Sequence, residues 1–399
     1  MSEQLVNPLP PSERIEPLDI LRGLALFGVM AVNLVYGFRV SPFRIYTLEP
    51  LPDPLPASFF DQTLDGLLQL FIAGKAVTIF SLLFGVGLAI QAERLRRTGR
   101  PVALLLRRLL MLLAIGLAHL LLIWNGDILT LYALAGLIAL PFLFASRWLL
   151  AGGALFFLAV NFTIALLQLQ PLPDAEWLKT HLVEADRIYG SGGFLEVLAL
   201  RVRELPYFMP SQLVGLPRTL ALFLFGALVW RLGILQQPLS NKRLFIGAAW
   251  MAIVGGFGLT VAMAAAGDLG EVPMSGIMLA TDLSMLALAL GYSAAIIAIA
   301  TGSRGRKALA WAAPVGRMAF SNYLTQSVIF SLVFYGYGLG LFNRMGVAAA
   351  LALGIAVYAL QAVVSAWWLR RHRFGPVEWL WRAVMYGARQ PWKSAASAP

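Results

Sequence analysis

Residues 108–141 read RLLMLLAIGLAHLLLIWNGDILTLYALAGLIALP, two apolar segments that meet at Asn125-Gly126-Asp127. Each segment has about the length of a membrane span, so the stretch predicts a helical hairpin inside a bilayer. His119 is the only histidine within an apolar span. At about 1.5 Å per residue it lies roughly two helical turns from Asp127. Because an imidazole in hydrocarbon costs free energy unless a partner satisfies it, these two residues form the first candidate functional pair.

The composition of the whole chain is that of a membrane protein. Hydrophobic residues make up 59% and charged residues 13% of the 399 positions, whereas soluble domains carry about 25% charged residues. We therefore predict an all-α, polytopic integral membrane protein with about ten transmembrane helices and one interfacial amphipathic helix. The net charge of +11 is explained by membrane topology, so we expect no nucleic-acid partner. Without cysteine the chain has no thiolate metal site or cysteine nucleophile, and we expect no metal site.

The apolar segments follow one another in a regular order. Beside the central pair, we expect spans at residues 20–38, 76–92, 148–169, 212–230, 244–265, 276–300, 315–337 and 347–368. Residues 59–73, FFDQTLDGLLQLFIA, place apolar residues at helical spacing opposite polar ones and predict the interfacial helix. The polar stretch 170–210 predicts one or two surface helices interrupted at 190–193.

These elements divide the chain into three parts. We expect an N-terminal segment at 1–18, a transmembrane domain at 19–369 with an extracytoplasmic loop at 170–210, and a basic tail at 370–399. The N-terminal segment is polar and proline-rich and has no cleavable signal peptide. A second proline-rich stretch, 41–57, follows the first span.

The charged residues predict the orientation of the spans. If the loops alternate between two sides, 22 of the 31 Lys and Arg residues fall on the side of the termini and 9 on the other, whereas the 20 acidic residues divide as 6 and 14. Because basic loops stay in the cytoplasm, we expect both termini to be cytoplasmic and the long polar loop to be outside. His119, Asp127 and Asn33 then lie toward the outer face, and Arg22 and Arg317 toward the inner face.

Five blocks of sequence resemble one known family. They are LDILRGLALFG at 18–28 with Asn33, GKAVTIFSLLFG at 74–85, GLAH to GDIL to YA at 116–133, GRMAFSNYLTQS at 316–327 and GPVEWLWR at 375–382. In this order, over almost the whole chain, they resemble the YeiB family of bacterial inner-membrane proteins, whose domain is the domain of unknown function 418. The resemblance implies a multi-pass protein of the bacterial inner membrane.

The YeiB family in turn resembles the transmembrane acyltransferases, which include the lysosomal heparan-α-glucosaminide N-acetyltransferase and bacterial O-acyltransferases of surface polysaccharides. This resemblance implies a cytoplasmic acyl-CoA donor, no tightly bound cofactor, and a glycan or lipid acceptor on the outer face or in the membrane. Membrane lipids are expected partners, and a homodimer is left open.

The chain departs from those acyltransferases at their histidines. Many of the O-acyltransferases carry an Arg followed by a His in the first span, whereas here Arg22 is followed by Asn33. The heparan enzyme uses a histidine in the loop after its first span, and residues 41–75 contain none. If the chemistry is retained, the base lies elsewhere, and His119 is the candidate.

The outer candidates each have a structural alternative. His119 could act as general base toward an acceptor hydroxyl or amine, oriented by Asp127, or it could cross-link helices as a neutral histidine. Asp127 could equally cap the helix that follows it. Asn322 and Tyr323 are candidates for hydrogen bonding the carbonyl oxygen as charge develops. With Gln326 they could line an acceptor pocket, or they could make interhelical hydrogen bonds.

The inner candidates are mostly charged. Asp19 and Arg22 lie three residues apart, the spacing of a helical ion pair, and an arginine there would also suit the phosphates of CoA. Glu378 and Arg382 have i, i+4 spacing, typical of a surface pair on an interfacial helix, and a role in donor binding rests on the resemblance. With Asn33 and Arg317, these residues complete the predicted substrate-binding set. Lys75 is expected to extend toward the headgroups.

Three functions remain open from the sequence. The first is a membrane-embedded acyltransferase that moves an acyl group from an acyl-CoA-type donor to an extracytoplasmic or lipid-linked acceptor, with His119, Asp127, Asn322 and Tyr323 as catalytic residues. The second is a transporter or permease for a small anion or amphiphile that uses the same polar groups, although no internal repeat supports it. The third is a non-catalytic scaffold that binds lipid or partner proteins.

Overall fold

The computed structural model describes residues 15–46, 58–96, 99–268 and 272–393. Within these ranges the chain is helical and has no β-strand, only an isolated bridge between His372 and Lys393. The helices are α1 (Glu16–Asn33), the π-helical η2 (Leu34–Phe38), the 3-10 turn η3 (Pro42–Tyr46), α2 (Phe59–Phe71), α3 (Lys75–Leu95), α4 (Pro101–Leu122), α5 (Leu129–Ala139), the 3-10 turn η5 (Phe142–Phe144), α6 (Arg147–Leu166), α7 (Ala175–Ser191), α8 (Phe194–Val214), α9 (Leu216–Arg231), α10 (Lys242–Asp268), α11 (Met274–Ala300), α12 (Ser303–Leu309), α13 (Ala312–Arg317), α14 (Ala319–Phe334), α15 (Val347–Arg371) and α16 (Pro376–Tyr386).

The all-helical membrane fold is confirmed. In the described ranges, seven helices are long and apolar enough to cross a bilayer, or eight if the bent pair α8 and α9 forms one span. Two shorter apolar helices, α5 and α14, fall in the fourth and ninth predicted spans. The number of ten spans is therefore approximate, because α5 and α14 are short for a bilayer core of about 30 Å.

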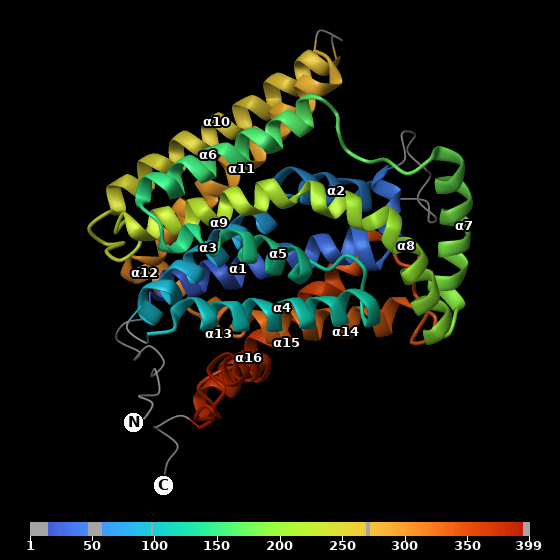
Figure 1. The fold of residues 1–399 in the computed structure, drawn as a ribbon. Coiled ribbons are helices and arrows are strands. Elements are labelled where there is room, and N and C mark those ends of the chain that lie inside the picture. The colour runs from blue at the N-terminus through green and yellow to red at the C-terminus, as the bar shows by residue number, and fades with distance from the viewer. Residues whose placement is uncertain (1–14, 47–57, 97–98, 269–271, 394–399) are drawn as a thin grey trace.

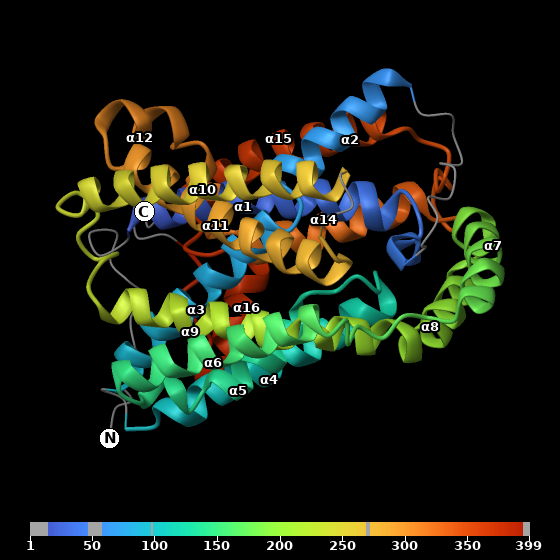
Figure 2. The same cartoon turned by 90° about the horizontal axis from the view of Figure 1, so that it is seen from above.

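The long helices run in nearly the same direction, so the molecule has two ends. Figure 1 shows α12 and the start of α1 at the left end and α7 at the right end, and Figure 2 keeps this arrangement after a quarter turn. We call them the α12 end and the α7 end. In the middle, α1 packs against α3, α11, α13 and α15, while α9 packs against α3, α5 and α6.

Glycines let neighbouring helices approach closely. A Cβ atom added to Gly23 of α1 would lie 2.2 Å from the carbonyl oxygen of Ala312 in α13, and one added to Gly226 of α9 would lie 2.2 Å from that of Leu82 in α3. In α4, a Cβ at Gly116 would lie 2.6 Å from the backbone nitrogen of Thr130. Small residues of this kind are typical of helix contacts in membranes. Gly116 thereby brings α4 against the start of α5, one turn before His119.

The ninth predicted span is interrupted. The structure ends α13 at Arg317 and starts α14 at Ala319, with Met318 outside helical geometry at φ −110° and ψ 26°. The amphipathic helix α16 packs across α4 and α14 near this break. A single apolar run in the sequence therefore forms two helices, because the break is satisfied by a side chain from α16, described below.

The polar stretch between the fifth and sixth spans forms two helices, as predicted, with the break at Gly192 between α7 and α8. Both lie at the α7 end (Figure 1). Helix α8 meets α9 at a bend of 42°. The N-terminal residues 1–14, most of the proline-rich loop (47–57) and the end of the basic tail (394–399) lie outside the described residues.

The two ends allow a direct test of orientation in a chain without cysteine. Lys179 in α7 and Lys307 in α12 are both exposed and lie at opposite ends (Figure 1). From the charge distribution, Lys179→Cys should react with a membrane-impermeant maleimide on intact cells, and Lys307→Cys should react only after permeabilisation. Labelling by mass shift measures both. The reverse pattern would overturn the predicted orientation.

Candidate functional site

His119 of α4 and Asp127 of the following turn lie together near the α7 end. Nδ1 of His119 is 2.9 Å from Oδ1 of Asp127, and the two residues are only 1% and 3% exposed. The carboxyl oxygen lies off the direction in which the ring N–H points, so the contact is not an aligned hydrogen bond. Nε2 of His119 has no hydrogen-bond partner among the described protein groups. The structure thus brings the predicted pair together and leaves Nε2 of His119 without a hydrogen-bond partner among the described protein groups.

Asp127 also caps α5. Its Oδ1 accepts from the backbone nitrogen of Leu129 at 3.1 Å, and its Oδ2 accepts from the backbone nitrogen and hydroxyl of Thr130 at 2.7 and 2.6 Å. A cap of this kind contributes about 1 kcal/mol. The two interpretations of Asp127 are therefore compatible, because one carboxylate satisfies the first turn of α5 while it contacts His119.

Tyr323 of α14 completes the group around the histidine. Its ring centroid lies 5.4 Å from that of His119, with 38° between the ring planes. Its hydroxyl is buried and has no hydrogen-bond partner among the described protein groups. Three helices, α4, α5 and α14, therefore bring an imidazole, a carboxylate and a phenol together in the protein interior.

Asn322 and Gln326 face α15 instead. The side-chain amide of Asn322 donates to Val315 O at 3.3 Å and to Ser365 Oγ at 3.0 Å. Gln326 Nε2 donates to Gln361 Oε1 at 2.7 Å, and Gln361 Nε2 donates to the backbone oxygen of Asn322 at 3.0 Å. The structure thus engages both side chains in bonds between α14 and α15, and it brings only Tyr323 of this motif to His119.

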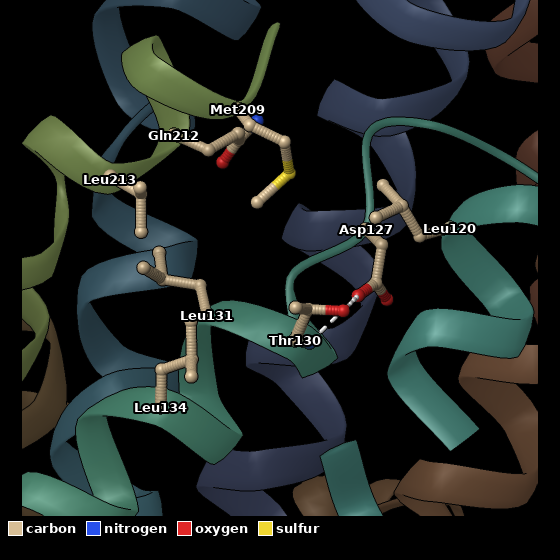
Figure 3. A pocket seen from close by; sticks show the side chains of 8 residues that line it. All are labelled: Leu120, Asp127, Thr130, Leu131, Leu134, Met209, Gln212 and Leu213. Atoms are coloured by element: carbon tan, nitrogen blue, oxygen red, sulfur yellow. Dashed lines mark hydrogen bonds between the residues drawn. The ribbon is translucent and has the colours of Figure 1, made fainter. Parts of the chain in front are cut away.

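A small pocket opens beside the pair, between α4, α5 and α8. Figure 3 shows Asp127 and Thr130 on one side of it and Met209, Gln212 and Leu213 of α8 on the other. It has room for about one water molecule. His119 does not line it, so the imidazole is reached from this pocket only past Asp127 and Leu120.

A second group of polar side chains is buried where α7 and α8 cover the central hairpin. Glu204, fully buried, accepts hydrogen bonds from Asn125 Nδ2 and from the hydroxyl of Tyr189 at 2.7 Å, and its Oε1 lies 3.0 Å from Nε2 of His181. The ring of His181 is stacked on Trp177. Asn125 belongs to the same turn as Asp127, so this cluster holds the turn that positions the first pair.

Arg201, one turn before Glu204, binds the same hairpin. Its Nη1 donates to the carbonyl oxygen of Leu122 at 3.0 Å, at the last residue of α4, and its guanidinium lies 4.9 Å from the ring centre of Tyr335. It is fully buried. Since the carbonyl groups at a helix end lack intrahelical partners, a cation here stabilises the end of α4.

Toward the α12 end, three arginines gather near the start of α4. Nη1 of Arg22 donates to Oδ1 of Asp19 at 2.9 Å, the predicted ion pair. Arg108 interacts with the charges of Arg22 and Arg382 and lies 3.6 Å from the ring centre of Trp381. The indole of Trp381 donates to the carbonyl oxygen of Arg108 at 2.8 Å. Helix α16 is thereby fixed on α4, and a region of positive charge forms.

Glu378 does not pair with Arg382. It accepts from the backbone nitrogens of Phe320 and Ser321 at 2.9 and 3.0 Å and from the hydroxyl of Ser321. It therefore caps α14 at the break described above. Burial raises the pKa of the Glu378 carboxyl above its usual range, although the hydrogen bonds from Ser321 act in the opposite direction. The guanidinium of Arg382 lies 4.5 Å from the ring centre of Phe374.

The two remaining predicted residues lie at helix ends. Asn33 is half-buried at the last position of α1, where the chain continues into the π-helical η2. Arg317 is half-buried at the last position of α13. In the described parts of the chain, no group of three or more His, Asp and Glu residues is arranged to hold a metal ion.

Comparison with known proteins places the chain in a family. The family model "Protein of unknown function (DUF418)" matches residues 229–388. The "Uncharacterized protein YxaH" of Bacillus subtilis (strain 168) is 33% identical over 97% of this chain and 98% of its own. The "Uncharacterized protein YeiB" of Escherichia coli (strain K12) is 28% identical over 95% and 98%. The chain belongs to the YeiB family.

A further relative also matches the chain over nearly its whole length. The "Uncharacterized 39.9 kDa protein in amylase 3'region" of Bacillus acidopullulyticus is 28% identical to this YeiB-family protein over 97% of the chain and 98% of its own. No solved structure matches the YeiB-family chain described here significantly. The DUF418 match covers Tyr323, Glu378 and Arg382, whereas His119 and Asp127 precede it.

The arrangement near the α7 end is suited to proton transfer in this YeiB-family protein. A carboxylate next to Nδ1 favours the tautomer that carries its proton there, which leaves the lone pair on Nε2. The nearby hydroxyl of Tyr323 is a hydrogen-bond donor. An imidazole and a phenol in this arrangement have the chemistry of a proton acceptor and a hydrogen-bond donor.

The cluster around Glu204 was not predicted from the sequence. Its residues His181, Arg201 and Glu204 belong to the stretch predicted to form surface helices in an extracytoplasmic loop, whereas all three are buried. One signal was available: Arg201 and Glu204 lie three residues apart on the same face of a helix as the apolar Val197 and Phe208. Two opposite charges within an apolar stripe indicate a buried ion site.

We expect the Glu204 cluster to be essential for stability. Glu204→Ala would leave Asn125, Tyr189 and His181 buried without their shared acceptor, so the free energy of unfolding should fall by about 3–5 kcal/mol. Glu184→Ala, which removes an exposed pair with Arg203, should cost less than about 1 kcal/mol. Denaturant melts of the purified proteins in detergent measure both. Equal losses would contradict the role assigned to Glu204.

Proposed function

We propose that this YeiB-family protein is a membrane-embedded acyltransferase that moves an acyl group from a cytoplasmic acyl-CoA-type donor to an extracytoplasmic or lipid-linked acceptor. One observation carries the proposal: a buried histidine has a carboxylate at Nδ1 and an unclaimed Nε2. Intramembrane ionisable groups of this kind are functional candidates because their burial is costly. The resemblance to transmembrane acyltransferases supplies the reaction class.

The reaction assigns one role to each member of the group. Nε2 of His119 accepts the proton of an acceptor hydroxyl while the acceptor oxygen attacks the thioester carbonyl carbon. The C–S bond then breaks, the acyl ester remains on the acceptor, and the imidazolium returns its proton to the CoA thiolate. Asp127, 2.9 Å from Nδ1, favours the tautomer that leaves Nε2 free to accept the proton. Tyr323 is better placed than Asn322 to hydrogen-bond the carbonyl oxygen, since the amide of Asn322 is engaged by Ser365.

The arginines near the α12 end suit the donor. Arg22, Arg108 and Arg382 form a region of positive charge next to Asp19 and the tryptophans of α16. Arginine is well suited to phosphate recognition. Arg108 and His119 lie on the same helix about 16 Å apart at 1.5 Å per residue, a separation of the order that the pantetheine arm of CoA spans. Phosphates held near Arg108 would therefore place a thioester near His119.

The direction of transfer follows from the proposed orientation. With both termini in the cytoplasm of the bacterial inner membrane, the α12 end and its arginines face the donor, and the α7 end faces the acceptor. The small pocket at Asp127 opens between α5 and α8 near the α7 end. We therefore assign that side to the acceptor.

Loss of the base should remove transfer without unfolding the protein. In purified protein supplied with radiolabelled acyl-CoA and lipid extract, His119→Ala should lower the rate of label transfer by about 10²–10⁴-fold. The matched control is His372→Ala, which changes a histidine of the tail that stacks on Trp368. A His119→Ala protein that transfers label as fast as the parent would exclude this base.

The donor end can be tested separately. Arg22→Gln removes a cation of the phosphate region, so the KM for acyl-CoA should rise about tenfold or more while kcat changes little, because charged hydrogen bonds contribute about 1.5–3 kcal/mol. The control is Arg304→Gln on the exposed helix α12, which removes one positive charge at the same end of the molecule. It should leave the KM for acyl-CoA unchanged. An unaltered KM in Arg22→Gln would remove this residue from the donor site.

A further inference from the structure

Two cations lie close together inside the membrane domain, away from His119. Arg218 of α9 donates from Nη2 to Thr78 Oγ1 at 2.8 Å, and its Nη1 lies 3.6 Å from Oδ1 of Asp282 in α11. Lys75, at the start of α3, is 7% exposed and donates from Nζ to the carbonyl oxygen of Gln69 at 2.9 Å. The sequence predicts that Lys75 extends toward the headgroups, and the structure holds its ammonium against the last turn of α2.

The charges of this cluster do not balance. Lys75 lies about one turn before Thr78, to which Arg218 donates, and the acid that the described contacts place beside Arg218 is Asp282. The second oxygen of Asp282 already accepts from Asn161 Nδ2 at 3.1 Å. Two positive groups and one negative group in a poorly solvated site leave a net positive charge, whose burial costs free energy.

The helix ends add to the positive potential. Lys75 is the first residue of α3, and Arg218 is the third residue of α9. The N-terminus of a helix carries a partial positive charge and favours anions, so cations are the unfavourable choice in both first turns. This arrangement would be stabilised by an anion bound between them.

The cluster keeps donors and access for such an anion. An ammonium has three donors and a guanidinium five, and the described contacts of Lys75 and Arg218 use only part of them. The side chain of Arg218 remains 19% exposed. Phosphate, with several acceptor oxygens, is the anion that such a Lys and Arg pair binds best.

We propose that Lys75 and Arg218 bind the phosphate of a membrane lipid. The position supports a lipid: Lys75 follows directly on α2, whose exposed Phe59, Phe60 and Phe71 are typical of a helix at the membrane surface. Lipid phosphates lie at that level of the bilayer. A soluble phosphate compound would offer the same chemistry, and the experiment below separates the two sources.

Tyr132 of α5 lies near this site. Its hydroxyl is 2.7 Å from that of Ser81, about one turn after Thr78, which accepts from Arg218. Tyr132 belongs to the helix whose first turn is capped by Asp127, the residue beside His119. That this lipid is the acyl acceptor rests on the proposed function; that the site binds lipid phosphate does not.

The test is a binding measurement on the purified full chain. Native mass spectrometry in detergent would compare phosphatidic acid with diacylglycerol, which has the same tails and no phosphate. The parent should bind phosphatidic acid at least tenfold more tightly than diacylglycerol, and Arg218→Gln and Lys75→Gln should each lose at least tenfold of that affinity. Arg218→Lys, which keeps the charge, should retain most of it. Arg243→Gln, at an exposed arginine of α10, should behave as the parent.

These outcomes distinguish a lipid phosphate from a soluble phosphate compound, and lipid binding from acyl transfer. Equal affinity of the parent for both lipids, or full binding by folded Arg218→Gln, would overturn the proposal. Displacement of phosphatidic acid by inorganic phosphate at similar concentration would overturn the lipid source. His119→Ala should bind phosphatidic acid as the parent does, so failure of acyl transfer would leave this measurement intact. Melting temperatures of every variant identify those that do not fold, and Arg218→Lys then decides the result.

Discussion

The carboxylate of Asp127 joins the end of α4 to the start of α5. One oxygen contacts His119 and the backbone of Leu129, and the other accepts from the backbone and hydroxyl of Thr130. In a bilayer no water satisfies the first turn of a helix, so the protein must supply the acceptor itself. The start of α5 and the orientation of the imidazole consequently depend on one side chain, and structure and proposed chemistry are difficult to separate there.

The segment between the fifth and sixth spans has a structural role that its polar composition conceals. Arg201 binds the end of α4, and Glu204 binds Asn125 in the turn that follows. Both ions are buried, and each contacts more than one element. Such a network makes the position of the turn unique, since any displacement would leave a charge without partners. Helices α7 and α8 thus hold the hairpin in place.

Hydrophobic pattern alone was sufficient for the helical membrane fold and for pairing His119 with Asp127, because the spans are long and a residue pair around one turn is local. The interruption at Met318 was not predictable, since its cause is Glu378, about sixty residues later in the chain. Lys75 was assigned to the headgroups because flanking lysines usually lie there; its ammonium donates to the carbonyl oxygen of Gln69, six residues earlier. The break at Met318 thus depends on a residue distant in sequence, and the position of Lys75 depends on how the chain turns between α2 and α3.

Helix α5 has 11 residues, about 16 Å at 1.5 Å per residue, against a hydrocarbon core of about 30 Å. It is surrounded by longer helices, α4 and α9 among them, so lipid need not deform to match it. At least one end of α5 therefore lies within the hydrocarbon thickness, where its terminal backbone groups must find their partners in the protein itself.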